Sequence, residues 1–274
     1  MKYILITGVS TGIGYATTKY FLEKGYFVFG SVRKKSDAVK LSQDFSNNFK
    51  PLLFDVTDDK AIANAVLDVQ HVIGDKGLSG LVNNAGIAVS GPMQHVPIEK
   101  LEHQINVNVL GVVRVTQAFL PLLGAIENSP FPPGRIIQIS SVSGTISAPF
   151  MGPYSASKYA LEAISDAFRR ELSIFGIKVV VIQPGPIQSD IWEKINEEHD
   201  YPDTYYAPIL QKRKKSVRKT GKNAIPAVAV AEKIWAGMEL KNPSTRYLVD
   251  KAAWKMKIYQ KLPDKMLDLS LIHI

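Results

Sequence analysis

The sequence predicts an α/β fold: a doubly wound parallel sheet of about seven strands with helices on both faces. Two observations predict this class. Short apolar runs, rich in β-branched and aromatic residues and largely unbroken by charge, recur along the chain, as expected of strands covered on both faces. Longer segments of helical length separate these runs, and such strand–helix alternation is typical of a parallel sheet.

The expected elements follow one another in regular order. Strands are expected at Tyr3–Ile6, Phe27–Phe29, Leu52–Phe54, Leu81–Val82, Ile136–Ile139, Val179–Ile182 and Arg246–Val249. Helices are expected at 13–24, 36–46, 58–74, 98–126, 154–175 and 227–240. Asp58 can cap the third helix, and Gly176 follows the fifth, where a glycine commonly ends a helix.

Nothing in the sequence divides the chain, because it has no repeat, no low-complexity linker and no interior break in composition. We therefore expect a single domain over 1–274. Residues 184–226 form a long insertion rich in charge, proline and tyrosine, and 250–274 form a C-terminal extension after the last strand. Connections as long as this insertion are usually functional or mobile in compact domains.

Composition removes several classes of chemistry. The chain has no cysteine, which excludes disulfides, thiolate nucleophiles and cysteine-ligated metals. None of its five histidines has the spacing of a metal-binding pair, so no metal is expected. No apolar run reaches the roughly 18 residues that span a bilayer, and the apolar N-terminus is too short for a signal peptide. We therefore expect a cytoplasmic protein.

The net charge of +8 is concentrated in one segment. Lys212–Lys222 contains seven basic residues and no acidic one, and the rest of the chain carries a net charge of +1. A general polyanion-binding surface is therefore a poor interpretation, and no nucleic-acid partner is expected. The segment is interpreted as a solvated helix face, and the alternative is a peripheral contact with anionic lipid.

A glycine-rich turn follows the first strand and opens the first helix. Glycine is needed where the backbone takes a positive φ, approaches a pyrophosphate or packs helix on strand, and the free N–H groups of a helix start attract phosphate. The turn predicts a dinucleotide site in a Rossmann-like domain, and the alternative is an ordinary glycine-rich turn. Its expected cofactor-binding residues are Gly8, Ser10, Thr11, Gly12, Ile13 and Gly14.

The spacing Thr-Gly-x-x-x-Gly-x-Gly resembles the signature of the short-chain dehydrogenase/reductase family, and further motifs follow in that family's order. They are Asn83–Gly86, Asn108–Gly111, Ser140–Gly144, Tyr154–Lys158 and Pro184–Ile187. The similarity extends to about residue 190. It implies an oxidoreductase that transfers a hydride between a nicotinamide cofactor and an alcohol or ketone.

Four residues form the expected catalytic set: Asn108, Ser141, Tyr154 and Lys158. A free tyrosine titrates near pH 10, and the charge of Lys158, one helical turn away, would favour tyrosinate. Tyr154 is thus expected as the general acid/base, with Ser141 orienting the substrate oxygen. The resemblance implies that Lys158 also binds the nicotinamide ribose and that Asn108 supports a proton relay. A Tyr and a Lys at this spacing also occur together by chance.

Ser140 competes with Ser141 for the serine role. We prefer Ser141 because the family places its serine before a small-residue step like Val142–Gly144, and because the thirteen-residue interval to Tyr154 fits. Separate replacement of each serine by alanine would decide between them.

The end of the second strand bears on which nicotinamide cofactor is used. An acidic residue there indicates NAD, whereas an arginine accommodates the 2′-phosphate of NADP. Arg33 is followed by two lysines, with no acid until Asp37, so NADP is preferred over NAD; the alternative is a solvated basic helix start. Further cofactor contacts implied by the resemblance are Asp55, Val56, Asn84, Ala85, Gly86, Tyr154, Lys158, Pro184, Gly185 and Ile187.

The resemblance implies that 184–226 is a substrate lid, completed by the C-terminal region. Apolar candidates for a pocket are Phe150, Met151, Ile191, Trp192, Tyr201, Tyr205 and Tyr206. The tail Leu262–Asp268 is similar to the tails of relatives acting on hydroxysteroids and retinol, which favours a hydrophobic steroid-, retinoid- or lipid-like substrate. Ordinary packing beneath a lid explains the same residues equally well.

Two other function classes compete with the enzyme. A redox sensor or scaffold that only binds the dinucleotide would be expected to lack the Tyr or the Lys, and Tyr154 and Lys158 are both present. A nucleic-acid-binding module would rest on Lys212–Lys222 alone, which has no interleaved aromatics. From the resemblance, 98–126 and 154–175 are the surfaces of an expected homodimer or homotetramer.

Overall fold

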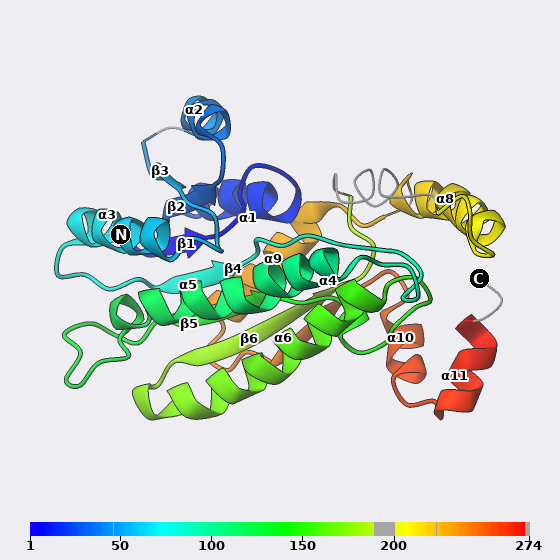
Figure 1. The fold of residues 1–274 in the computed structure, drawn as a ribbon. Coiled ribbons are helices and arrows are strands. Elements are labelled where there is room, and N and C mark those ends of the chain that lie inside the picture. Colours follow the sequence, from blue (N-terminus) through cyan, green and yellow to red (C-terminus); the bar gives the residue numbers. More distant parts are fainter. Residues whose placement is uncertain (46, 189–200, 223, 272–274) are drawn as a thin grey trace.

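The computed structural model describes residues 1–45, 47–188, 201–222 and 224–271. It has one sheet of seven parallel strands in the order β3-β2-β1-β4-β5-β6-β7, surrounded by helices (Figure 1). The doubly wound fold class is confirmed. The order reverses direction between β1 and β4, and in open α/β sheets ligands bind beyond the carboxyl ends of the strands at such a point.

The strands are β1 Tyr3–Ile6, β2 Phe27–Val32, β3 Phe49–Leu53, β4 Gly80–Asn83, β5 Arg135–Ile139, β6 Lys178–Pro184 and β7 Arg246–Val249. The α-helices are α1 Gly12–Glu23, α2 Lys35–Asp44, α3 Asp59–Ile73, α4 Ile98–Ile105, α5 Gly111–Phe119, α6 Gly152–Glu171, α8 Ala207–Lys222, α9 Ala227–Glu239, α10 Ala253–Tyr259 and α11 Asp264–Leu271. A π-helical turn covers Asn106–Leu110, and 3₁₀ turns cover Pro121–Leu123, Val142–Gly144 and Leu172–Phe175.

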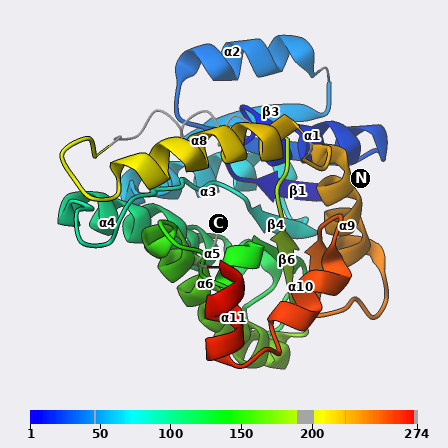
Figure 2. The ribbon, with the colours of Figure 1, turned by 90° about the vertical axis from the view of Figure 1, so that its right-hand side faces the viewer.

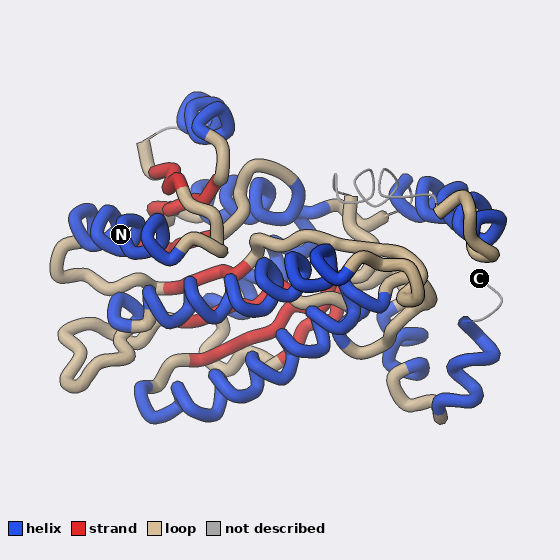
Figure 3. Tube along the Cα trace, viewed as in Figure 1, coloured by secondary structure: helices blue, strands red, loops and turns tan. Residues whose placement is uncertain are grey.

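Two apolar cores lie on the two faces of the sheet, as the helix layers of Figure 3 indicate. One core joins β-strand side chains to α3 and α5 through fully buried residues such as Phe119. The other joins the opposite side chains to α1 and α9 through Phe21 and Ile234. Because both faces of the sheet are covered, the strands are unbroken apolar runs, and this is why they could be predicted from the sequence.

Several local signals act as expected. Asp58 caps α3, its carboxylate accepting hydrogen bonds from the backbone N–H groups of Lys60 and Ala61 at 3.0 Å each. Gly176 takes a φ of +73° after the 3₁₀ turn that ends α6. Such a left-handed position costs glycine little, so the chain can turn directly into β6.

The third strand runs Phe49–Leu53 and not Leu52–Phe54, so that expectation was displaced by three residues at its start. Pro51 has no N–H to donate and argued against a strand. The strand is tolerated because β3 is at the edge of the sheet, where it pairs only with β2.

The helix expected over 98–126 is interrupted. It consists of α4, the π-helical turn and α5, and it ends before the 3₁₀ turn at Pro121. Single π-helical turns inside helices are rare and are frequent at functional sites. The interruption turns the buried side chain of Asn108 toward the loop after β4.

The insertion 184–226 is not wholly irregular, because α8 occupies its second half. Figure 2 views the end of the sheet where α8, α10 and α11 lie, which is the right-hand side of Figure 1 and the side to which β6 leads. Among the described residues, no helix is both long and apolar enough to cross a bilayer.

Candidate active site

The glycine-rich turn has the backbone that its sequence requires. Gly8 and Gly12 take φ values of +70° and +58°, where side chains are strained. A Cβ at Gly14 would lie 2.2 Å from the carbonyl oxygen of Gly8, so only glycine lets α1 pack this closely on the turn. Thr11 precedes α1 without a side-chain cap, which leaves N–H groups of the first turn for a ligand. Ser10 and Thr11 are exposed, and Ile13 follows in the helix.

The loop after β4 holds this turn in shape. The Asn84 side chain donates to the carbonyl oxygens of Thr7 and Gly8 at 2.9 Å each. In return, the Thr7 hydroxyl accepts from the N–H groups of Asn84 and Ala85, also at 2.9 Å each. A Cβ at Gly8 would meet the Cα of Ala85 at 2.9 Å. The turn and the Asn-Asn-Ala-Gly segment therefore form one rigid unit.

Arg33 lies beside the end of β3. It follows β2 directly, its side chain is 63% exposed, and its guanidinium is 3.9 Å from a carboxylate oxygen of Asp55. Asp55 also accepts from the N–H and hydroxyl of Thr57 at 2.9 and 2.7 Å. Val56 is buried against Gly111 at the start of α5. An exposed cation and a fixed carboxylate thus share the carboxyl edge of the sheet beside the glycine-rich turn.

Tyr154, in the first turn of α6, lies beside Ser141, which follows β5, so that hydrogen bonding with Ser141 favours its ionised form. The Ser141 hydroxyl also accepts from the N–H of Ser143 at 3.1 Å and donates to the carbonyl oxygen of Pro184 at 3.4 Å. The Ser140 hydroxyl is buried without a partner, and a Cβ on Gly144 would lie 2.9 Å from it. Of the two competing serines, Ser141 is the one in contact with Tyr154.

Burial raises the pKa of Tyr154, and the hydrogen bond with Ser141 opposes the rise. The phenol is therefore protonated at neutral pH, a state suited to donating a proton. Lys158 is not among the groups that shift it, so its expected lowering of this pKa stays a prediction for the cofactor-loaded protein.

The Lys158 side chain is buried, and its Nζ donates to the carbonyl oxygen of Ile139 at 2.8 Å. The same Nζ lies 5.7 Å from the centre of the Tyr154 ring. Burial lowers the pKa of Lys158 to about 8, and the charge of Glu162 opposes this. Lys158 thus changes protonation state close to physiological pH.

Asn108 lies in the π-helical turn and is buried. Its side-chain oxygen accepts from the N–H of Ile87 at 2.9 Å, and its Nδ2 donates to the Ile87 carbonyl oxygen and to the Ser157 hydroxyl at 2.9 and 3.1 Å. Ser157 in turn donates to the Tyr154 carbonyl oxygen at 2.7 Å. Asn108 therefore connects the loop after β4 with the helix that carries Tyr154 and Lys158.

The segment after β6 closes the site from the other side. The N–H of Gly185 donates to the Val249 carbonyl oxygen at 2.9 Å, and a Cβ at this glycine would lie 1.8 Å from a carboxylate oxygen of Asp250. Pro184 ends the strand, and Ile187 is buried in a bridge with Ile225. The carboxyl ends of β1, β4, β5 and β6 thus bring the predicted motifs to one edge of the sheet.

Part of the expected substrate wall forms an aromatic cluster next to α6. Tyr206 packs on Phe150 and His95, with ring centres 5.7 and 5.9 Å apart, and the ring of Tyr201 is 6.3 Å from that of His95. Met151 directly precedes α6, whereas Tyr205 is fully exposed. Ile191 and Trp192 lie outside the described residues.

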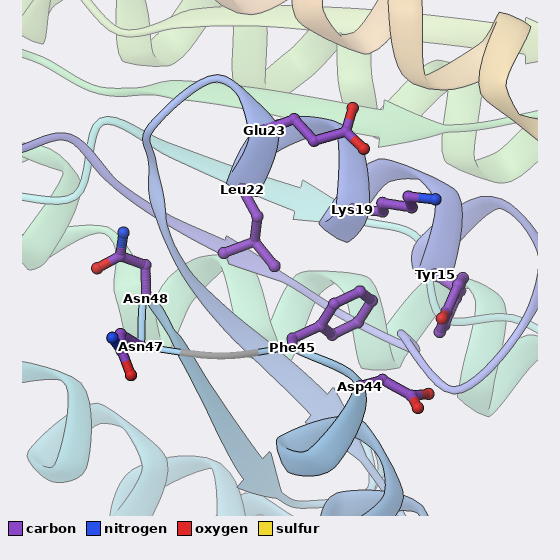
Figure 4. Close-up of a pocket in the computed structure, with 8 residues that line it drawn as sticks. All are labelled: Tyr15, Lys19, Leu22, Glu23, Asp44, Phe45, Asn47 and Asn48. Carbon is purple, nitrogen blue, oxygen red and sulfur yellow. The ribbon is translucent and has the colours of Figure 1, made fainter.

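A separate open pocket of about 510 Å³ lies against the outer side of α1 (Figure 4). It is lined by Tyr15, Lys19, Leu22, Glu23, Asp44, Phe45, Asn47 and Asn48. None of the predicted catalytic or cofactor-binding residues lines it. Because the chemistry-bearing side chains meet at the carboxyl edge of the sheet, we assign the candidate site there.

The residues present fit a nicotinamide dinucleotide. The backbone approach permitted by Gly8 and Gly14, and the uncapped start of α1, suit a pyrophosphate. Arg33 would accommodate the 2′-phosphate on the adenosine ribose, Asp55 and Val56 would contact the adenine, and Lys158 would bind the nicotinamide ribose. A carbonyl placed beside them would have a proton donor in Tyr154 and a hydrogen-bond donor in Ser141.

Sequence reasoning missed two residues near the site, Gln104 and Arg213. Gln104 is buried, and its side-chain amide forms hydrogen bonds with the backbone of Ile87 and Val89. It lies one helical turn before Asn108 in the sequence, and this spacing of two polar residues was the signal that could have identified it. The Arg213 guanidinium lies over the ring of Phe150, 5.5 Å from its centre. The sequence did not distinguish Arg213 from the other residues of the basic run, because its contact with Phe150 depends on where α8 packs in the fold.

The chain is similar to known proteins along nearly its whole length. The family model described as short chain dehydrogenase matches residues 2–200. The NADPH-dependent 3-dehydrocapnine reductase of Ornithobacterium rhinotracheale is 48% identical, over 98% of this chain and 95% of that protein. Retinol dehydrogenase 16 of Mus musculus is 32% identical, over 94% and 82%. A solved short-chain dehydrogenase from Streptomyces avermitilis has a TM-score of 0.79 at 24% identity, over 99% and 95%, and shares the fold.

Proposed function

The chain belongs to the short-chain dehydrogenase/reductase family of NAD(P)-dependent oxidoreductases, and we propose that it reduces a ketone on a hydrophobic substrate to an alcohol with NADPH. The observation that carries this proposal is the contact between Tyr154 and Ser141, with Lys158 over the Tyr154 ring. The name of the relative at 48% identity supports both NADPH and the direction of reduction.

In this proposal each side chain has a defined task. Ser141 donates a hydrogen bond to the substrate carbonyl and fixes it beside Tyr154. NADPH, when bound, supplies the hydride that reduces the carbonyl carbon. Tyr154 gives its phenolic proton to the carbonyl oxygen, and the protonated Lys158 stabilises the tyrosinate left behind. Asn108 and Ser157 hold α6 against the loop after β4, which keeps Tyr154 and Lys158 in register with the cofactor site.

NADP specificity is assigned to Arg33. Its guanidinium is exposed at the end of β2, the position from which an arginine would accommodate the 2′-phosphate of the adenosine ribose. Asp55 lies beside it and positions the guanidinium without burying it. The other proposed cofactor contacts are Gly8, Ser10, Thr11, Gly12, Ile13, Gly14, Val56, Asn84, Ala85, Gly86, Pro184, Gly185 and Ile187.

The single domain is proposed to use 184–226 as a substrate lid and 250–274 as a C-terminal extension beside it. Exposed apolar side chains on α4, the π-helical turn and α6 (Ile98, Leu110 and Tyr159) support a homodimer or homotetramer that uses those surfaces. A cytoplasmic location and a peripheral lipid contact of Lys212–Lys222 stay predictions.

The proposal is tested by binding and turnover together. We expect NADPH to quench protein fluorescence at concentrations at least tenfold lower than NADH, and Arg33→Gln to remove most of that difference. Tyr154→Phe is expected to lower ketone-dependent NADPH oxidation at least a thousandfold with NADPH affinity unchanged, because only the proton donor is lost. Ser140→Ala is the matched control for Ser141→Ala.

Each outcome has a separate meaning. Substantial turnover by Tyr154→Phe would remove Tyr154 from its role. Equal loss in the Ser140 and Ser141 variants would remove the serine assignment. A preference for NADH would refute the role of Arg33 and leave the Tyr154 chemistry standing.

A further inference from the structure

Arg213 is a cation in an unusual place. It lies in the first half of α8, and its guanidinium sits 5.5 Å from the centre of the Phe150 ring. The side chain is partly buried, unlike that of its neighbour Lys212, which is exposed. Within the described part of the chain no carboxylate lies within ion-pair distance of the Arg213 guanidinium. Burial accordingly lowers the pKa of Arg213, with no opposing charge.

An arginine that loses solvent without gaining a counter-ion costs folding free energy, and such groups are normally paired. The aromatic face of Phe150 offsets part of this cost. An aromatic ring accepts no ordinary hydrogen bond, so this contact leaves the guanidinium N–H groups with their capacity to donate. That edge fits the paired oxygens of a carboxylate, sulfonate or phosphate.

The surroundings relate this cation to the substrate. Phe150 lies two residues before α6, and Tyr154 is in the first turn of that helix. Phe150 also contacts Tyr206, which continues the aromatic cluster toward His95 and Tyr201. Phe150 thus contacts both the Arg213 guanidinium and the aromatic cluster, four residues before Tyr154.

We propose that the Arg213 guanidinium binds an oxyanion head group on the substrate, so that the reaction favours an anionic amphiphile over a neutral hydrophobic ketone. This inference rests on the proposed function, and it names the substrate's charge, which that function leaves open. The aromatic cluster holds the apolar part of the molecule, and Arg213 fixes its polar end.

The test uses NADP⁺-loaded protein and three probes with the same ten-carbon chain: decanoate, decanesulfonate and decanol. Titration calorimetry is expected to give dissociation constants for the two anions at least tenfold below that for decanol. Arg213→Met keeps an apolar contact with Phe150 and removes the charge, so it is expected to abolish the difference while leaving decanol and NADP⁺ affinity unchanged. Arg213→Lys is expected to retain part of the difference in affinity between the anions and decanol.

Lys212→Met is the matched control, because it removes one charge from the same basic run at an exposed position. If Lys212→Met lowers the preference for the two anions as much as Arg213→Met does, the preference comes from the overall charge of the basic run and the inference about Arg213 fails. The inference is also overturned if the wild type binds the three probes equally, or if the difference survives in Arg213→Met. Inorganic sulfate that displaces decanesulfonate at matched concentration would indicate a site for a free anion and would exclude a head-group site.

Two further outcomes distinguish a substrate head group from a membrane lipid, and failure of this inference from failure of the proposed function. If Arg213→Met weakens flotation with phosphatidylglycerol vesicles but leaves decanoate binding intact, the guanidinium serves a membrane contact and the inference fails. If the wild type does not bind NADP⁺ at all, the proposed function fails. The alkyl series on the unloaded protein then still reports on Arg213.

Discussion

Tyr154 and Lys158 illustrate how burial sets the direction of the chemistry at the scale of single residues. Burial favours the neutral form of each, raising the pKa of the phenol and lowering that of the amine to about 8. The phenol is ready to donate, but the ammonium that must stabilise the resulting tyrosinate is easily lost. The reductive reaction therefore depends on the protonated form of Lys158.

We expect the kcat/KM for ketone reduction to fall as pH rises through about 8, because Lys158 then loses its proton. A lysine with an ordinary pKa near 10.4 would place this limb about two units higher. The measurement is a pH profile of NADPH oxidation from pH 6.5 to about 10. Lys158→Arg, which stays charged throughout, should retain only weak activity but show no limb near 8. A wild-type profile that is level up to pH 9.5 would contradict this assignment.

The residue pattern could be predicted from the sequence where the chemistry is carried by local motifs. Tyr154 and Lys158 are one helical turn apart, and Ser141 follows a strand, so their meeting required only the sheet order. The contact of Arg213 with the Phe150 ring could not be predicted, because it depends on the path of a long insertion across the fold. Nor could the pKa of Tyr154, since burial depends on neighbours from several elements.

At the scale of elements, the π-helical turn between α4 and α5 organises the loop after β4. Gln104 and Asn108 both face that loop, and their amides bond the backbone of Ile87 and Val89. This loop continues the segment that braces the glycine-rich turn. The sequence predicted one helix here because its apolar spacing is nearly unchanged by a single wide turn.

Replacing Gln104 by leucine is expected to lower the free energy of unfolding by about 2 kcal/mol, because the buried N–H of Val89 loses its partner. The Ile87 carbonyl oxygen loses one of its two donors and keeps Asn108. Since the loop supports the glycine-rich turn, the dissociation constant for NADPH should rise several-fold. Urea unfolding and fluorescence titration measure the two effects. His103→Leu, at an exposed position on the same helix, is the control and should change neither. If Gln104→Leu lowers stability but leaves NADPH affinity unaltered, the loop after β4 does not support the cofactor site.

The whole molecule separates a rigid sheet from a lightly attached C-terminal end. No residue of α10 is buried, and Trp254, Ile258, Met266 and Leu269 are among the exposed apolar side chains. The Gln260 side-chain amide donates a hydrogen bond of 2.9 Å to the hydroxyl of Thr145, beside the 3₁₀ turn that follows Ser141. These helices therefore contribute surface near the site and little to the core.

A chain that ends at Ala252 is expected to keep its thermal midpoint within about 4 °C, because little apolar area is lost from the core. The KM for a long-chain ketone should nevertheless rise at least fivefold, with kcat for a short ketone unchanged. Thermal unfolding followed by circular dichroism and steady-state kinetics give the two values. A large drop in the midpoint would mean that α10 and α11 belong to the folded core.

The sheet order also has a consequence for the time course of folding. β1 is central, yet Ile4 pairs with Gly80, a partner far along the chain. During synthesis the first three strands leave the ribosome before β1 can receive its second neighbour, and contacts this distant in sequence slow the search for the native state. The turn at Gly8 also takes its final shape only after β4 has been synthesised, since the side-chain amide of Asn84 donates a hydrogen bond to the Gly8 carbonyl oxygen. Competence to bind a dinucleotide is thus acquired late, only after the nascent chain has passed the fourth strand.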